Sequence, residues 1–406
     1  MGSILFHFHI NMELKLKNKV LTTLSDLLHQ NRDGIIEANG NDIEAYPDMD
    51  ESMKDRLKVD DSKIDGMINS LKEVSHQVDP EGKVLYNHLR EDGLRVINKT
   101  VPFGTILIIY ESRPDVTIEA AATAFKAGNK ILLKGGKESL NTNLLLTSLW
   151  QEAFKKCGVD KSYVEYLTLS HSQTQQLIKE NKRGIDLIIP RGGERLIDFV
   201  LQNSSVPVIV SGRGNNFLFI DDDVDFDMAI KLVINGKKRI SVCNAIDKVL
   251  IHKELTNTND KINKLVVSLK EKGIDVWGSN EIVEICNEIK VENNVNTLCE
   301  EYLAPKLYLT IIDEMDEAIS MINKYSGGHT AVIATNNLAQ ANKFMDLVDC
   351  AAVYHNASSR FTDGGQYGVG AEIAISTQKL HFRGPLGAQE LVTNKWFVYG
   401  QGQVRD

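Results

Sequence analysis

Short apolar runs alternate with helical segments along most of the chain, and this alternation restricts the fold more than any other feature. Thr105–Tyr110 and Lys130–Leu133 are mostly apolar, and an alanine-rich helix is predicted between them over Val116–Ala127. Strands with continuous apolar sequence are typical of parallel sheets that are covered on both faces. Further runs of this kind are Tyr163–Leu169, Ile185–Ile189 and Val206–Val210. The sequence therefore predicts an α/β fold built on parallel sheets.

Other elements frame this α/β region. Apolar positions recur at helical spacing from Leu14 to Val78, which predicts a helical entry segment. Two short extended runs, Lys83–Tyr86 and Leu94–Ile97, are joined by a turn at Glu91–Gly93 and predict a hairpin. A lone hairpin needs a partner sheet. The closing run Lys395–Tyr399 also predicts a strand.

A second α/β region is predicted from about residue 223 to residue 352. It contains a charged helical stretch and a strand, helix and strand in succession. These segments are Glu254–Lys272, Lys306–Ile312, Met315–Tyr325 and Thr330–Thr335.

Composition excludes several classes of function. The formal net charge of -9 and the pI of about 5.7 argue against binding to nucleic acid or to an anionic membrane, which requires clustered positive charge. The five cysteines are widely spaced, without a zinc-ligand pattern, and indicate a reducing, cytoplasmic environment without a structural metal. The first ten residues lack the features of a signal peptide, and we expect a ragged end or an upstream start there.

Cys243 is the main candidate for chemistry. It lies in the stretch Gly236–Asp247, after three consecutive cations at positions 237–239. Nearby positive charge favours the thiolate, the form of cysteine that attacks carbonyl carbon. Most cysteines of this kind are instead buried as small apolar residues. A nucleophile is therefore a hypothesis that the rest of the chain has to support.

Two glycine turns each follow a predicted buried strand and precede a helix. They are Lys134–Glu138 and Pro190–Arg195, and such turns allow backbone amides to approach a phosphate. Each alone is equally consistent with an ordinary strand-to-helix turn, but two of them in one sheet suggest an extended nucleotide. The acidic run Asp221–Asp227 lacks the glycine and glutamate of a calcium loop and is predicted to end a strand and open a helix.

Two further polar segments have alternative interpretations. His329 lies in a glycine-rich segment before a strand, where capping or packing is as plausible as a substrate contact. The loop Asn356–Gly365 carries one cation and several hydroxyls, which suits an anionic or zwitterionic ligand or a hydrogen-bonded turn.

Taken together, the motifs resemble the aldehyde dehydrogenase superfamily and, within it, the family of γ-glutamyl phosphate reductases, also called glutamate-5-semialdehyde dehydrogenases. The resemblance covers about residues 11–405. The segments that carry it are Val101–Gly104, Tyr110–Asp115, Ala127–Asn129, Lys134–Glu138, Pro190–Gly193, Val242–Ala245, Glu301–Pro305, Ser326–Thr330, Asn356–Gly365, Ile375–Leu380 and Arg383–Pro385.

The resemblance implies an activity: NADPH-dependent reduction of γ-glutamyl phosphate to glutamate 5-semialdehyde, the second step of proline biosynthesis. Cys243 would be the nucleophile that forms a thioester. The catalytic set would include Asn244 beside it and Ser112, which with the Cys243 amide is a candidate oxyanion donor.

The resemblance also implies binding residues. Lys134 would bind the adenosine ribose, with Gly135 beside it, and Lys137 would favour NADPH through the 2'-phosphate. Gly192 and Gly193 would approach the pyrophosphate, and Glu301 would hold the nicotinamide ribose. The candidate contacts for substrate carboxylate or phosphate are Arg113, His329, Ser359 and Arg360.

The same resemblance implies the domain organisation and the partners. Residues 1–222 would form N-terminal helices and an NADPH-binding domain with an oligomerisation hairpin at 84–101. Residues 223–355 would form the catalytic domain, and residues 356–406 would return to the cofactor domain and add an oligomerisation strand. We expect a homodimer or homotetramer, with substrate from a separate glutamate 5-kinase that associates transiently.

One absence favours a phosphorylating reductase. Hydrolytic aldehyde dehydrogenases carry a general-base glutamate, whereas the corresponding stretch here, Val208–Asn215, has no carboxylate. Two alternatives stay open. A coenzyme A-acylating aldehyde dehydrogenase would also lack this base, and a catalytically silent, oligomeric nucleotide-binding homologue would keep the fold without turnover.

Overall fold

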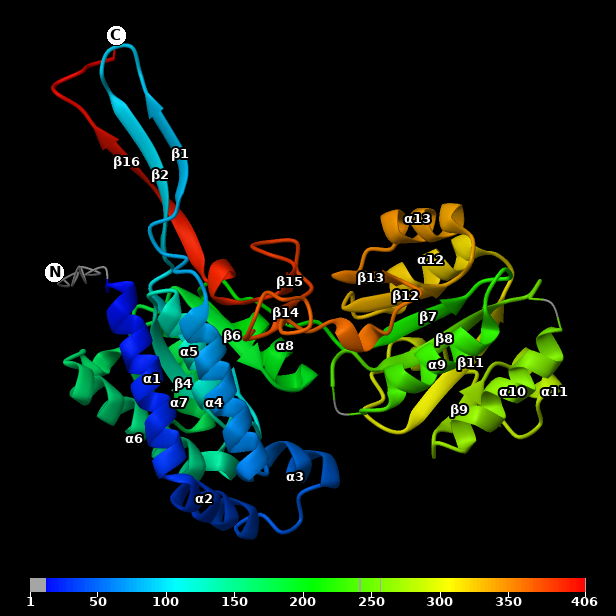
Figure 1. Ribbon diagram of the computed structural model, residues 1–406. Coiled ribbons are helices and arrows are strands. Elements are labelled where there is room, and N and C mark those ends of the chain that lie inside the picture. The colour runs from blue at the N-terminus through cyan, green and yellow to red at the C-terminus, as the bar shows by residue number, and fades with distance from the viewer. Residues whose placement is uncertain (1–11, 241, 256, 406) are drawn as a thin grey trace. The chain divides into compact units, whose positions relative to one another are not determined.

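The computed structural model describes residues 12–240, 242–255 and 257–405. The expectation for the first ten residues therefore lies outside the described residues. The chain forms two compact units (Figure 1). The first, here called the N-terminal unit, contains the chain up to residue 210 with 368–374 and 386 onward, and the second, the central unit, contains 211–367 and 375–385. The sequence predicts changes of domain at 222 and 355, whereas the compact units change at 210 and 367.

Helices make up the entry segment of the N-terminal unit, as predicted. Those of this unit are α1 (Leu14–Gln30), α2 (Arg32–Glu44), α3 (Glu51–Leu57), α4 (Asp61–His76), α5 (Val116–Lys126), α6 (Leu140–Cys157), α7 (His171–Glu180) and α8 (Glu194–Asn203). The apolar stripe of α1 is completely buried at Val20, Leu21 and Leu24. Asp50 and Asp60 cap α3 and α4 by accepting hydrogen bonds from backbone amides. Local sequence signals and burial therefore agree in this segment.

The sheet of this unit is parallel and has the strand order β5-β4-β3-β6. Its strands are β3 (Thr105–Tyr110), β4 (Lys130–Lys134), β5 (Val164–Tyr166) and β6 (Leu187–Arg191). The prediction of a parallel α/β sheet is confirmed. The prediction of a strand at Val206–Val210 is wrong in extent, because this run makes a single bridge, from Val208 to Ile188. Pro207 within the run has no N–H to donate to a ladder.

The predicted hairpin is confirmed and has the partner that it needs. Strands β1 (Val84–Leu89) and β2 (Arg95–Pro102) pair antiparallel, and β16 (Val392–Tyr399), near the end of the chain, pairs with β2 along its whole length. The three strands extend beyond the helices of the N-terminal unit as a separate ribbon (Figure 1). Every residue of β1 is exposed, so this ribbon contributes little to the core.

The central unit contains a seven-stranded parallel sheet with the order β10-β9-β11-β8-β7-β12-β13. Its strands are β7 (Asn216–Ile220), β8 (Ile246–His252), β9 (Asp275–Gly278), β10 (Lys290–Val291), β11 (Lys306–Ile312), β12 (Thr330–Ala334) and β13 (Ala352–His355). Its helices are α9 (Phe226–Lys237), α10 (Thr258–Lys270), α11 (Asn280–Ile285), α12 (Met315–Tyr325) and α13 (Leu338–Leu347). Apolar side chains on both faces of the sheet are buried under these helices. The second α/β region is thus also confirmed.

Short elements complete the fold. They are the single 3₁₀ turns η1 (Lys137–Ser139), η2 (Lys161–Tyr163), η3 (Val295–Leu298), η4 (Ser359–Phe361) and η5 (Ala388–Glu390), and the strand pair β14 (Ile375–Ser376) and β15 (Gly384–Pro385). The acidic run behaves as predicted, because β7 ends at Ile220 and α9 begins at Phe226, with the Asp225 carboxylate accepting from the Met228 amide at 3.1 Å. Among the described residues, no helix is both long and apolar enough to cross a membrane.

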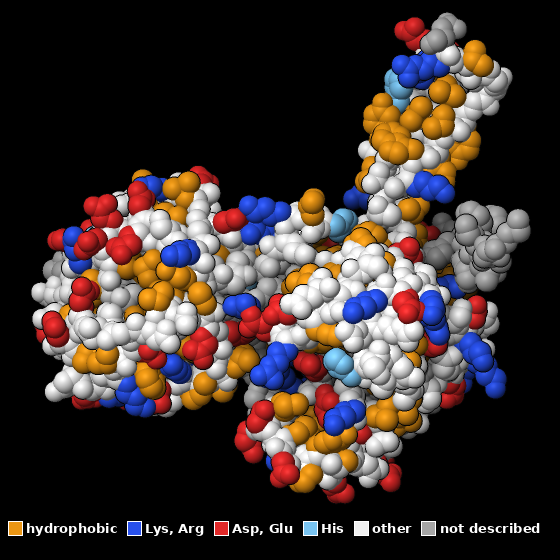
Figure 2. All heavy atoms as spheres, turned by 180° about the vertical axis from the view of Figure 1, so that it is seen from behind, with side chains coloured by type: hydrophobic (Ala, Val, Ile, Leu, Met, Phe, Trp, Pro, Cys, Tyr) orange, Lys and Arg blue, Asp and Glu red, His pale blue; other side chains and the backbone are white. Residues whose placement is uncertain are grey.

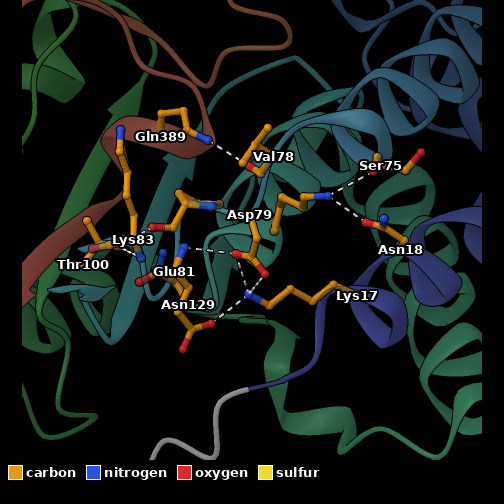
Figure 3. Close-up of polar contacts among 12 residues, drawn as sticks. Lys17, Asn18, Ser75, Val78, Asp79, Glu81, Lys83, Thr100, Asn129 and Gln389 are labelled. Carbon is orange, nitrogen blue, oxygen red and sulfur yellow. Dashed lines mark hydrogen bonds and ion pairs between the residues drawn. The ribbon is translucent and has the colours of Figure 1, made fainter. Parts of the chain in front are cut away.

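A buried ion-pair cluster ties α1 to the segment that leads into the hairpin (Figure 3). The Lys17 Nζ lies 3.1 Å from an Asp79 carboxylate oxygen and 2.7 Å from Glu81 Oε2, and the Lys17 side chain has no exposed surface. Nearby, Lys126 donates to Asn18 Oδ1 at 2.7 Å, and burial lowers the pKa of Lys126 to about 8. The start of the hairpin is therefore held by buried charge as well as by strand pairing.

Substitution of Lys17 tests this cluster. Lys17→Met leaves two largely buried carboxylates without their cation, and we expect the free energy of unfolding of the N-terminal unit to fall by about 3 kcal/mol. Urea unfolding followed by circular dichroism measures this loss.

The matched control is Lys19→Met on the exposed side of the same helix, which we expect to change stability by less than about 0.5 kcal/mol. Equal stability of the two variants would show that the cluster does not hold the hairpin segment.

Candidate functional site

In the N-terminal unit, three predicted site segments lie at one edge of the sheet. Ser112–Arg113 follows β3, Lys134–Gly135 ends β4, and Gly192–Gly193 follows β6. Strands β4 and β6 are the two neighbours of β3, and all three run parallel. Because the carboxyl ends of adjacent parallel strands lie at the same edge, the two glycine turns are on either side of the Ser112 segment.

Ser112 is buried in a constrained conformation. Its φ of 46° is uncommon for a residue other than glycine. The conformation is held by the Glu138 carboxylate, whose Oε1 accepts from Ser112 N at 2.8 Å and from Ser112 Oγ at 2.9 Å. Arg113, next in the chain, is half-buried. The Ser112 hydroxyl is thus oriented by a carboxylate from the following turn.

The first glycine turn leaves no room for a side chain. A Cβ on Gly135 would lie 2.3 Å from Asn143 Nδ2 and 2.9 Å from the Tyr166 hydroxyl. The Lys134 Nζ donates to the Gly135 carbonyl at 2.6 Å, and burial lowers the pKa of Lys134. Lys137 is exposed, with its Nζ 5.5 Å from the centre of the Tyr46 ring. The turn therefore combines two lysines with a backbone at Gly135 that neighbouring side chains approach closely.

The second glycine turn already holds an anion. Gly193 caps α8, and its N–H donates to Glu111 Oε2 at 3.0 Å, while a Cβ on Gly192 would lie 2.4 Å from the same oxygen. A helix N-terminus favours negative charge, so a carboxylate is stable there. The turn is therefore suited to an anionic group, and a pyrophosphate would have to replace Glu111. Glu111 was not singled out from the sequence, although it precedes the predicted Ser112.

In the central unit, Cys243 lies partly buried in the turn between α9 and β8. The structure changes the electrostatic argument for this thiol, because Lys237 is buried and pairs with Asp247. Arg360 is a cation close to this thiol, since its guanidinium donates to the side chain of the adjacent Asn244. Burial lowers the pKa of Arg360, the nearby Arg239 lowers it further, and the Cys243 thiolate opposes both effects.

Asn244, Ser359 and Arg360 form one cluster beside the thiol, although the sequence separates the first from the other two. The Asn244 Nδ2 donates to the Thr362 carbonyl at 3.1 Å, and its Oδ1 accepts from the Arg360 guanidinium. The Ser359 hydroxyl donates to the Asn244 carbonyl at 2.7 Å. The loop after β13 is thereby fastened to the nucleophile turn.

Glu301 lies next to the same turn. A Cβ on Gly214 would be 2.5 Å from Glu301 Oε1 and 2.6 Å from Cys243 Cα, so both residues lie against one glycine. This close approach explains why position 214 needs a glycine. The fold thus brings Glu301 to the nucleophile turn from the segment before β11.

His329 lies deeper than the other candidates. Its side chain has no exposed surface, and its Nδ1 lies 2.7 Å from Thr330 Oγ1, which is 2.9 Å from Thr362 Oγ1. These contacts give His329 a packing environment, and its role as a substrate contact stays a prediction.

Sequence reasoning missed three buried polar residues around this site: Asn215, Asn216 and Lys248. Asn216 Nδ2 donates to the Cys243 carbonyl at 2.7 Å. Lys248 Nζ donates to Asn215 Oδ1 at 2.7 Å, and burial lowers the pKa of Lys248 to about 7. All three lie at or near the start of predicted or observed strands, but their partners are far away in the chain. No local pattern in the sequence identifies such contacts.

Comparisons with known proteins show the family to which the chain belongs. The profile of the aldehyde dehydrogenase family matches residues 9–274 and 288–371. A gamma-glutamyl phosphate reductase from Caldicellulosiruptor bescii is 40% identical over 403 residues, which are 98% of this chain and 96% of that protein. The one from Thermotoga maritima is 41% identical over 400 residues, which are 98% of this chain and 95% of that protein.

Solved structures extend the similarity to the fold. The crystal structure of the Thermotoga maritima gamma-glutamyl phosphate reductase matches with a TM-score of 0.91 at 40% identity and covers 98% of this chain and 96% of that one. An acetylating aldehyde dehydrogenase from Geobacillus thermoglucosidasius matches with a TM-score of 0.71 at 17% identity over 98% and 94% of the chains, which shows a shared fold. The aldehyde dehydrogenase-like fold is confirmed, and the chain belongs to the aldehyde dehydrogenase family, within the group of gamma-glutamyl phosphate reductases.

Proposed function

We propose that this chain reduces γ-glutamyl 5-phosphate to glutamate 5-semialdehyde and phosphate with NADPH, through a thioester on Cys243. This reaction is the second step of proline biosynthesis from glutamate. The observation that carries the proposal is the position of Cys243. The Arg360 guanidinium donates to the side chain of the adjacent Asn244, and Cys243 and Glu301 both lie against Gly214. Relatives at about 40% identity over nearly the whole chain support the substrate.

The first step is acyl transfer to the thiol. The Cys243 Sγ attacks the acyl carbon, a carbon–sulfur bond forms, and the bond from that carbon to the phosphate oxygen breaks. Phosphate leaves with the electron pair. We assign to Arg360 the stabilisation of the attacking thiolate by its charge and a contact with the anionic leaving group. Residues 208–215 contain no carboxylate to activate water, which protects the thioester from hydrolysis.

Donors to the tetrahedral oxyanion and to the substrate are part of the same proposal. We assign the oxyanion to the backbone amide of Cys243 and to Ser112, and the substrate carboxylate or phosphate to Arg113, His329, Ser359 and Arg360. In support, Arg360 is half-buried beside the thiol. Hydrogen bonds to neighbouring residues fix the positions of Ser359 and His329.

The residues of the N-terminal unit fit a dinucleotide. Enzymes of the aldehyde dehydrogenase family use NAD(P), and we propose NADPH here because Lys134 and Lys137 are next to the first turn and suit a 2'-phosphate. We assign Gly192 and Gly193, which are exposed, to the pyrophosphate, Gly135 to the cofactor beside Lys134, and Glu301 to the nicotinamide ribose. The bond from Gly193 N–H to the Glu111 carboxylate supports an anion at this turn. When bound, NADPH supplies the hydride that reduces the thioester.

The coenzyme A-linked alternative has less support. The acetylating aldehyde dehydrogenase shares only 17% identity with this chain, whereas the reductases share about 40%. The silent-homologue alternative is disfavoured because the thiol, both glycine turns and Glu301 are all present.

A single assay in the reverse direction separates these functions. With pyrroline-5-carboxylate as the source of glutamate 5-semialdehyde, we expect reduction of NADP to depend on phosphate and not to respond to coenzyme A. Cys243→Ala removes the nucleophile, and we expect kcat to fall by about 10³-fold or more.

The control for this assay is Cys157→Ala, which removes a partly buried cysteine of α6 in the N-terminal unit. We expect it to keep wild-type turnover. Activity that depends on coenzyme A would favour the acylating enzyme, and wild-type activity in Cys243→Ala would refute the thioester.

Charge at position 360 gives a second test. We expect Arg360→Gln to slow alkylation of Cys243 by iodoacetamide at pH 7 and to move the rate profile to higher pH, because loss of the cation leaves fewer thiols ionised. Arg360→Lys keeps the charge and should retain much of the rate. Identical profiles for the Gln and Lys variants would show that Arg360 does not act through its charge.

Self-association is proposed for the β1-β2-β16 ribbon. Figure 2 shows apolar side chains gathered along it, and these include Val84, Leu85, Tyr86, Leu89, Trp396, Val398 and Tyr399, each about half or more exposed. Tyr86 and Trp396 pack edge to face with their ring centres 5.6 Å apart. Exposed apolar patches and open strand edges are typical of interfaces. We propose that a second copy covers this surface, in a homodimer or homotetramer.

Light scattering coupled to size-exclusion chromatography tests this interface. We expect Tyr86→Ser with Trp396→Ser to lower the molar mass toward that of one chain. Leu338→Ser, at an exposed apolar position of α13, is the control that should keep the mass of the wild type. An unchanged mass in the double variant would place the interface elsewhere.

Two proposals about the cellular setting follow from the substrate. We propose a cytoplasmic enzyme, since its mechanism needs a reduced thiol and the described cysteines form no disulfide.

We also propose transient association with a glutamate 5-kinase that supplies the acyl phosphate. Failure of the two enzymes to co-purify and to channel the intermediate would count against that association.

A further inference from the structure

We propose that Asn216 is a positioning residue for the nucleophile: its side-chain amide holds the Cys243 turn against the starts of β7 and β12. This inference rests on the proposed function only in that Cys243 is taken as the reacting thiol. Asn216 is the first residue of β7, and its side chain is completely buried.

The amide nitrogen of Asn216 contacts the backbone at Cys243 and just after it. Its Nδ2 donates to the Cys243 carbonyl at 2.7 Å and to the Ala245 carbonyl at 2.7 Å, and the Gly214 carbonyl lies 3.0 Å away. An asparagine Nδ2 carries two N–H donors, so both are used by backbone acceptors here. The side-chain oxygen of Asn216 can only accept, so the Nδ2 group alone can donate to the carbonyls of Cys243 and Ala245.

The amide oxygen of Asn216 extends the link to a third segment. Its Oδ1 accepts from the Thr330 backbone N–H at 3.0 Å, where β12 begins. Strands β8, β7 and β12 are neighbours in the parallel sheet, so their amino-terminal ends lie together. One side chain therefore joins the beginnings of three adjacent strands.

The backbone alone does not supply this link. The β7–β8 ladder pairs Asn216 with Ile246 and then shifts register between Asn216 and Phe217. The turn before β8 is closed internally by a hydrogen bond from Ala245 N to Val242 O at 3.1 Å. The Asn216 amide is thus a fixed connection between this turn and the sheet at the point where regular strand pairing is interrupted.

The position of the turn matters for catalysis. The Cys243 carbonyl belongs to the peptide plane between residues 243 and 244, and the Ala245 carbonyl to the plane between residues 245 and 246. Fixing both carbonyls holds the short segment that begins at Cys243. A displacement of the reacting group by about 1 Å lowers the rate by about 100-fold. Removing the two donors of Asn216 should therefore reduce the rate of acyl transfer more than it weakens substrate binding.

Asn215 provides a matched comparison. It is equally buried, and its Nδ2 donates to the Leu298 carbonyl at 2.7 Å and to the Tyr325 carbonyl at 2.8 Å. Lys248 joins the Asn215 Oδ1 to the Glu300 carbonyl. These contacts hold the segment that carries Glu301. The two adjacent asparagines thus hold different parts of the site.

The experiment compares Asn216→Asp with Asn215→Asp. Each substitution conserves size and exchanges N–H donors for oxygens that cannot donate. Four quantities are measured in the full-length enzyme. They are kcat and KM for the phosphate-dependent reaction, the dissociation constant of NADPH, and the rate of Cys243 alkylation by iodoacetamide from pH 6 to pH 9, which is followed by peptide mass spectrometry.

For Asn216→Asp, we expect kcat to fall by about 100-fold, KM and the NADPH dissociation constant to stay within about threefold of wild type, and the alkylation profile to change. For Asn215→Asp, we expect weaker NADPH binding and a wild-type alkylation profile. Asn216→Ser is the second variant, for the case that Asn216→Asp does not fold. It keeps one hydroxyl donor in a smaller side chain, and we expect an intermediate kcat.

Either of two results would overturn the positioning role. One is wild-type kcat in Asn216→Ser or Asn216→Asp. The other is that kcat and the alkylation rate change equally in the Asn215 and Asn216 variants, and that both changes parallel the loss of melting temperature. That result would indicate that Asn216 contributes to packing alone. Failure of the proposed function is recognised separately, by a wild type that shows no phosphate-dependent turnover, and the alkylation comparison still tests the position of Cys243 in that case.

Discussion

Parallel pairing of adjacent strands is the constraint on which the candidate sites depend. In the N-terminal unit, the order β4-β3-β6 brings the carboxyl ends of three strands together, with Lys134, Ser112 and Gly193 at the same edge. In the central unit, the order β8-β7-β12 does the same for amino-terminal ends, where Cys243, Asn216 and His329 lie. A parallel strand requires a crossover connection, so residues distant in sequence meet at one edge of a sheet.

Two buried lysines of the described chain are paired with carboxylates. Lys237 pairs with Asp247, and Lys17 pairs with Asp79 and Glu81. Such pairing is expected, because an isolated buried charge is costly. The pairing of Lys237 also changes the interpretation of the three cations at positions 237–239, which precede Cys243 in the sequence. Lys237, six residues before Cys243 in the sequence, is committed to a structural pair, whereas Arg360 comes from the loop after β13 and donates to the side chain of Asn244, next to Cys243.

The chemistry is consistent with the relatives and with what the chain lacks. A thiol with a nearby guanidinium, no carboxylate in the segment 208–215 and a glutamate beside the nucleophile turn suit transfer of an acyl group from phosphate. The similarity of about 40% to gamma-glutamyl phosphate reductases extends over nearly the whole chain. The likeness to an acetylating aldehyde dehydrogenase at 17% identity shows a shared fold, and a fold by itself does not determine the reaction.

Local sequence determined the elements that depend on local physics. The apolar runs predicted β3, β4 and β11, and helical spacing predicted the entry helices. The acidic run predicted the junction of β7 and α9. These predictions were possible because burial patterns and helix caps depend on residues that are close in sequence. The motifs also marked Cys243, Glu301 and the two glycine turns as candidates. Tertiary structure decided which groups meet: Arg360 with Cys243, Glu111 with Gly193, and Asn216 with three segments of backbone. These contacts depend on strand order and on partners far away in the chain, and no local pattern of residues encodes them.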